Sequence, residues 1–121
     1  MNRETLIKYF LNNFPEYRDA FEQHLEDYNE ILIHVFFGDT INERLIEVLE
    51  KDKENNKEIE KIFKFLEKMA LDGDLDVKEV LIVTILERLG DDKNLLKKSY
   101  KYMGKNTKIA SDDIERFWGR I

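Results

Sequence analysis

The sequence predicts an all-α fold, most simply a single domain over residues 1–121. Apolar residues recur at three- and four-residue steps from Leu6 to Trp118, which is the spacing of one helix face. The chain has one proline and five glycines, so its loops must be few and short. Charged residues make up 38% and aromatic residues 12% of the chain, a composition typical of a folded, helix-rich globular protein.

Two helices are predicted before residue 30. Apolar spacing predicts the first over residues 3–13. Pro15 suits the first turn of the second helix, because the N–H that proline lacks would have no partner there. The expected apolar stripe of this second helix consists of Tyr17, Phe21, His24, Leu25 and Tyr28.

The stretch from Ile31 to Phe37 contains a single polar side chain, His34. A short strand also fits such a run, but the sequence holds no second strand candidate to take its backbone hydrogen bonds. We therefore expect a short buried helix over about residues 29–37, ended by Gly38. A tight extended segment is the alternative.

Caps and apolar stripes predict the remaining helices over about residues 41–53, 57–72, 77–89 and 92–103, with a last short helix that opens at Ser111 or Asp112. The expected N-caps of the first four are, in order, Asp39 or Thr40, Asn56, Asp76, and Asp91 or Asp92. The polar run 51–56 is expected to be a hinge, and KNTK before the last helix a loop. The segment Val80–Leu86 is apolar on nearly every side, which predicts that all of it, Val83 included, lies in the core.

These helices are expected to form stacked antiparallel hairpins. One hairpin pairs 41–53 with 57–72, and a second pairs 76–89 with 92–103, offset by about 35 residues. The segment DGDLDVKEVLIVTILERLGDD (72–92) resembles a HEAT-type repeat unit. A short HEAT-like α-solenoid is therefore the preferred architecture, and an irregular helical bundle is the alternative.

The net charge of −6 is unevenly distributed. Residues 1–54 hold 13 acidic and 6 basic side chains, so the first half repels nucleic acid and can attract a basic partner. The lysines of segment 95–108 are too sparse for a nucleic-acid patch and suit a solvated helix face. The longest apolar run is far shorter than the roughly 20 residues of a membrane helix, and no signal peptide is recognised. Without cysteine the chain has no disulfide or zinc-thiolate chemistry, and we expect a cytoplasmic protein.

Enzyme signatures are absent from the sequence. There is no glycine-rich phosphate loop, no HExxH pair and no second copy of a Glu–His unit. We expect no cofactor and no bound metal, although His24 and His34 could converge on a metal with Glu30 and Asp39. The favoured interpretation of His34 is structural, as a buried side chain that donates a ring N–H to a carbonyl or to a carboxylate such as Glu30.

The segment FPEYRDAFEQHLEDYNEILIHVFFGD (14–39) resembles a motif of small uncharacterised bacterial helical proteins. The matching residues are Pro15, Glu16, His24, Glu30, His34, Phe37, Gly38 and Asp39. Similar small helical proteins act as immunity partners of bacterial toxins. The resemblance covers about a fifth of the chain and implies a bacterial, all-α, non-enzymatic protein.

Together these features predict an immunity protein that neutralises a toxin domain by binding it. The surface expected to bind a basic partner, for example a nuclease domain, consists of Glu26, Asp27, Asp39, Glu43 and Glu47. Glu30, His34, Phe37 and Gly38 are expected to form the structural motif beneath that surface. A helical scaffold or regulatory adaptor with HEAT-like packing is the alternative, and a metal-dependent enzyme built on the two histidines is a third hypothesis.

Overall fold

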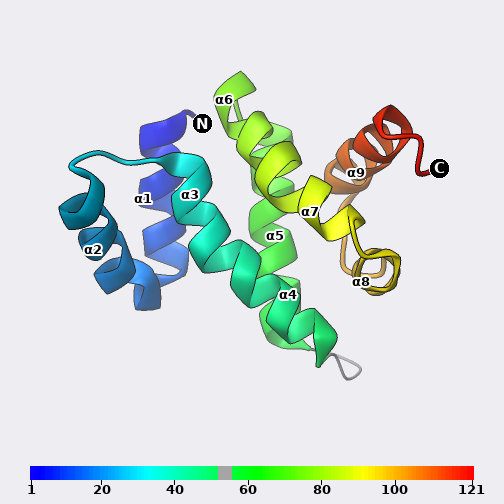
Figure 1. Ribbon diagram of the computed structural model, residues 1–121, viewed down its shortest axis with the longest axis horizontal. Helices are drawn as coiled ribbons and strands as arrows, with labels where there is room; N and C mark the ends of the chain where they lie inside the picture. The colour runs from blue at the N-terminus through cyan, green and yellow to red at the C-terminus, as the bar shows by residue number, and fades with distance from the viewer. Residues whose placement is uncertain (52–55) are drawn as a thin grey trace.

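The computed structural model describes residues 1–51 and 56–121, and throughout these ranges the fold is all-α, as predicted (Figure 1). Neither range contains a β-strand. The elements are, in order, α1 (Arg3–Asn13), the 3-10 turn η1 (Pro15–Tyr17), α2 (Arg18–Tyr28), α3 (Ile33–Phe37), the π-helical segment η2 (Gly38–Asn42), α4 (Glu43–Glu50), α5 (Lys57–Asp72), α6 (Leu75–Glu79), the π-helical segment η3 (Val80–Leu86), α7 (Glu87–Gly90), α8 (Lys93–Ser99) and α9 (Lys105–Phe117).

Two long helices cross the centre of the molecule. The elements α3, η2 and α4 follow one another without a break from Ile33 to Glu50, and α6, η3 and α7 do so from Leu75 to Gly90. Figure 1 shows these two helices running side by side in the same direction, with α5 returning between them. On one side lie α1 and α2, and on the other α8 and α9.

Side-chain caps set the start of most helices. Asn2 and Thr5 form a reciprocal capping box at α1, where the Asn2 Oδ1 accepts from the Thr5 N–H at 2.9 Å. Asn56 caps α5 and Asp92 caps α8, in agreement with two of the predicted caps. The cap of α6 is Asp74, which accepts from the Val77 N–H at 3.0 Å, and the predicted cap, Asp76, lies in the first turn instead.

A cluster of aromatic rings joins the N-terminal helices to α5. The Phe10 ring of α1 is 4.9 Å from that of Phe37 and 5.5 Å from that of Phe65 in α5. Phe36 contributes a further edge-on contact with Phe10 at 5.7 Å. All four rings are buried, and such paired rings add to the stabilisation given by their buried area.

The prediction that a helix ends at Gly38 is wrong. Gly38 has helical dihedral angles, and the helix continues through it, so Asp39 and Thr40 lie in mid-helix and cap nothing. The expected helix over 29–37 also starts late, because Asn29 ends α2 in a left-handed conformation and α3 begins only at Ile33. The glycine serves a close approach instead: a Cβ at Gly38 would come within 2.8 Å of the Arg88 Nη1 of the neighbouring long helix.

Three expectations for the second half also need correction. The last helix begins at Lys105, so the predicted loop KNTK forms its first turn and Ser111 lies buried in its middle. The preceding helix, α8, ends at Ser99 rather than near residue 103. Val83 is 44% exposed, although five of its neighbours in the segment Val80–Leu86 are buried. The predicted hinge at 51–56 lies largely outside the described residues.

Candidate interaction surfaces

The most acidic surface of the described chain belongs to α2 and its flanks. Residues 16–30 carry six carboxylates and one arginine, and all six carboxylate residues are exposed. They include the predicted site residues Glu26 and Asp27, and Asp27 accepts a hydrogen bond from the Gln23 side chain at 2.9 Å. The surface is therefore strongly negative and has a single cation in sequence, Arg18, to offset it.

Two apolar side chains of α2 are also exposed. The spacing of the stripe predicted both to be buried, but Tyr28 is 46% exposed and Leu25 is 36% exposed. The helix packs instead through Phe21 and His24, whose rings each lie 5.6 Å from Phe36 of α3. A partly exposed tyrosine is a residue type that protein interfaces favour.

A buried histidine fixes α2 against the start of α3. The His24 Nε2 accepts a hydrogen bond from the Leu32 backbone N–H at 2.9 Å, and Leu32 is the N-cap residue of α3. The ring thus takes up one of the N–H groups that a helix start leaves without an internal partner. His24 is among the few buried polar residues of the N-terminal half, and its role here is to hold the acidic helix in place.

The other predicted acidic residues form a row on the long helix α3–η2–α4. Asp39, Glu43 and Glu47 are exposed and spaced four residues apart, which places them on about the same helix face. Glu47 already pairs with Arg44 at 2.9 Å and with Lys51 at 3.7 Å. Asp39 and Glu43 form no ion pair with any residue that the structure describes.

This row does not join the α2 surface into the single patch that the sequence suggested. Glu43 and Glu47 lie on α4, whereas Glu26 and Asp27 lie near the end of α2. Figure 1 places α2 at the outer edge of the molecule and α4 at its lower end, apart from each other. The molecule therefore has two acidic surfaces, of which the α2 surface is the more strongly negative.

His34 connects the two long helices. Its Nδ1 lies 2.7 Å from the Thr84 Oγ1 of η3, a hydrogen bond that joins α3 to the second long helix. The side chain is partly exposed rather than buried, and its partner is Thr84 rather than the predicted Glu30, which lies in the bend before α3. Phe37, on the same turn, is fully buried. The π-helical segments η2 and η3 pack against each other beside this contact.

The helix α9 is attached to α5 by a carboxylate. Glu67 of α5 accepts hydrogen bonds from the Thr107 N–H at 2.8 Å and the Asn106 N–H at 3.1 Å, so a side chain from another helix caps α9. Burial raises the pKa of Glu67, but these hydrogen bonds and those from the two side chains outweigh it, so the pKa lies below its ordinary value of 4.5. A Cβ at Gly104 would lie 2.5 Å from the Glu67 carboxylate, so only glycine leaves room for this cap.

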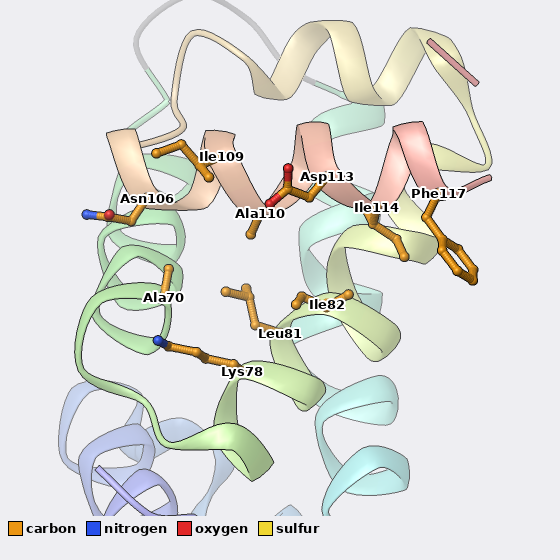
Figure 2. A pocket seen from close by; sticks show the side chains of 10 residues that line it. All are labelled: Ala70, Lys78, Leu81, Ile82, Asn106, Ile109, Ala110, Asp113, Ile114 and Phe117. Atoms are coloured by element: carbon orange, nitrogen blue, oxygen red, sulfur yellow. The ribbon is translucent and has the colours of Figure 1, made fainter. Parts of the chain in front are cut away.

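An apolar groove of about 430 Å³ lies between α9 and the helices below it (Figure 2). Its walls are Ala70 of α5, Leu81 and Ile82 of η3, and Ala110, Ile114 and Phe117 of α9. Figure 2 shows Ile109 near one end of the groove and Phe117 at the other. The apolar spacings of the sequence give no sign of this groove, because the buried face of α9 is polar: Thr107, Ser111 and Glu115.

The described residues also bear on metal binding and on membrane insertion. They contain no group of three or more histidine, aspartate or glutamate side chains arranged to hold a metal ion, and His24 and His34 have the separate partners given above. In the same ranges, every helix is too short or too polar to cross a membrane.

The comparisons with known proteins identify a family. No curated protein and no solved structure matches the chain. One family model, described as a domain of unknown function, DUF7674, matches residues 7–119, and that span includes both acidic surfaces and the groove. The chain therefore belongs to the DUF7674 family.

Proposed function

We propose that this chain is a non-enzymatic binding protein that holds a basic protein partner on the surface of α2. The observation that carries the proposal is the combination on this one helix of exposed carboxylates with exposed Tyr28 and Leu25. Carboxylates steer a positively charged partner and fix its orientation. A partly exposed tyrosine supplies the apolar anchor on which much of the binding energy of an interface depends.

The partner that we favour is a bacterial toxin domain, which makes the chain an immunity protein. Its support is the resemblance of residues 14–39 to small helical bacterial proteins, a segment that contains the whole of α2. A nuclease domain has the basic surface that such an inhibitor would meet. The row Asp39, Glu43 and Glu47 then makes a secondary contribution, since Glu47 is already paired within the chain.

The test is a binding measurement on the protein recovered with the tagged chain from its native host. We expect Glu26→Lys combined with Asp27→Lys to raise the Kd at least about tenfold, with a steep dependence on salt. The matched control is Asp76→Lys combined with Glu79→Lys, which changes the net charge equally at two exposed residues on α6. Equal weakening by both pairs would mean that only net charge matters and would contradict the proposal.

Further variants test the contribution of Tyr28 to binding separately from that of the carboxylates, and compare the contribution of α2 with that of α4. We expect Tyr28→Ala to weaken binding while Val35→Ala, at an exposed valine of α3, leaves it unchanged. Reversal of Glu43 and Glu47 to lysine should have a smaller effect than reversal of Glu26 and Asp27. A larger effect at α4 would move the binding surface to the long helix.

A helical scaffold or adaptor is the alternative function. It is favoured by one feature of the fold, in which the helices 33–50 and 75–90 run parallel with α5 returning between them (Figure 1). Repeated units of helical solenoids stack in a similar way and build extended binding surfaces. Recovery of several unrelated partners with the tagged chain, in place of one basic protein, would favour this alternative.

A further inference from the structure

The groove beside α9 leaves large apolar side chains exposed to solvent. Phe117 at one end is 75% exposed and Ile109 at the other is 51% exposed, while the walls between them are mainly apolar and include the charged Lys78 and Asp113. Burying apolar side chains of this size against a partner is favourable, because it removes apolar area from water. A partner surface that filled the groove would therefore bury the apolar side chains of its walls and also Ile109 and Phe117 at its ends.

The charge of this region separates it from the rest of the molecule. The helix α9 carries three basic and three acidic side chains, whereas residues 16–30 carry six carboxylates and one arginine. Two copies brought together at α2 would repel each other, but two copies brought together at α9 would not. A strongly acidic or strongly basic partner would meet no excess of opposite charge on α9.

The residues that line the groove are arranged so that it can face an identical copy. Ile109, Asp113 and Phe117 follow one another at four-residue steps on α9, so an antiparallel second α9 sets the partner's Phe117 at the Ile109 end. Lys78 and Asp113 line opposite walls of the groove and carry opposite charges. An interface with twofold symmetry requires this, because each feature of the surface must meet its complement on an identical copy.

We propose that the groove is occupied by a second copy of this chain, in a twofold-symmetric dimer built on α9. In this dimer Ile109 and Phe117 of each copy enter the groove of the other, and Lys78 faces the partner's Asp113. Asp113 also pairs with Arg116 at 3.1 Å, but both side chains are largely exposed, so this pair can rearrange at low cost. The α2 surface lies at the other end of the molecule and stays free (Figure 1).

The test is the molar mass in solution, measured by light scattering and sedimentation from low micromolar to near-millimolar concentration. We expect the mass to rise with concentration towards twice the 14.6 kDa of the chain. Ile109→Glu and Phe117→Glu should each raise the dimer Kd at least about tenfold. Leu75→Glu, at an apolar residue that is 86% exposed and lies outside the groove, should leave the dimer intact.

A charge exchange distinguishes this dimer from association elsewhere on the surface. Lys78→Glu and Asp113→Lys should each weaken the dimer, and the double variant should restore it, with circular dichroism confirming that every variant is folded. A monomer at all concentrations would overturn the proposal. So would a dimer that persists in both the Ile109→Glu and Phe117→Glu variants, since its interface would then lie elsewhere.

Discussion

The helices α1 and α9 lie towards opposite ends of the molecule and are held to it by different kinds of contact. The buried residues of α1 are Leu6, Ile7, Phe10 and Leu11, all of them apolar. Those of α9 are Thr107, Ser111 and Glu115, all of them polar. The first helix is therefore stabilised mainly by burial of apolar area. The second packs Ala110 and Ile114 against the core and is also held near its two ends by hydrogen bonds and an ion pair at particular atoms.

This difference has consequences for how each end responds to its conditions. Apolar contacts do not depend on the ionisation of any group, so the packing of α1 is insensitive to pH. The helix α9 depends on a carboxylate, because Glu67, whose pKa is lowered by the hydrogen bonds that it accepts, caps its first turn. The C-terminal end is thus the part of the molecule that acid can release first.

The largest loss of stability is expected when the apolar packing of α1 is disrupted. Phe10→Ala removes a fully buried ring that contacts Phe36, Phe37 and Phe65, and we expect it to lower the free energy of unfolding by about 3–5 kcal/mol. Urea denaturation followed by circular dichroism measures this loss. A loss below about 1 kcal/mol would show that the aromatic cluster is not the main support of α1.

Removal of the ion pair between Arg120 and Glu115, near the end of α9, should cause the next largest loss of stability. Arg120→Ala leaves Glu115, which is 2% exposed, without the guanidinium that donates to it at 2.9 Å, and we expect a loss of about 2–3 kcal/mol in unfolding free energy. The control is Arg116→Ala, which removes an exposed ion pair with Asp113 and should cost less than about 0.5 kcal/mol. Similar losses for both arginines would contradict a special role for Arg120.

The cap from Glu67 should make stability depend on pH. Because its pKa is lowered in the folded state, its contribution is complete above the ordinary value of 4.5 and is lost as the pH falls through the lower, folded-state pKa. We expect Glu67→Gln to cost about 1 kcal/mol at pH 7, as the loss of a cap does, and to cost less in acid. Denaturation curves at both pH values check this, and an equal cost at each would rule out the ionised cap.

The smallest effect is expected at Val83, where apolar composition suggests a core position. Because Val83 is 44% exposed, Val83→Asp should change the unfolding free energy by less than about 1 kcal/mol. The matched variant Val80→Asp places the same carboxylate at a fully buried valine of η3 and should cost several kcal/mol. Similar thermal melts for the two variants would contradict the orientation of this helix.

The same contrast explains how far the sequence predicted the fold. The all-α class and the bounds of α1 and α5 were predicted correctly, because their buried residues are apolar and repeat with the helical period. The apolar pattern predicts a loop in the first half of α9, because Thr107 and Ser111 are polar and do not register in it. Its anchor, Glu67, lies some 40 residues away in sequence, which no local pattern reveals.

The candidate surfaces could be predicted only in part. Charge alone indicated an acidic N-terminal half, and every predicted acidic residue is exposed. Apolar spacing placed Leu25 and Tyr28 in a buried stripe, because it cannot show that α2 packs on one side only, through Phe21 and His24. Gly38 was interpreted as a helix end, since its actual neighbour, Arg88, is distant in sequence. These errors concern contacts between elements, which a local apolar pattern does not show.

Amide hydrogen exchange, followed by mass spectrometry at pH 7 and at a series of acid pH values below 4.5, tests the contrast between the two ends most directly. Protection factors, which remove the intrinsic effect of pH on exchange, are compared for α1 and α9. We predict that both helices are protected at pH 7 and that in acid α9 loses protection while α1 keeps it, because Glu67 no longer accepts from Asn106 and Thr107 as a carboxylate. Loss of protection in both helices together, or none in α9, would contradict the account.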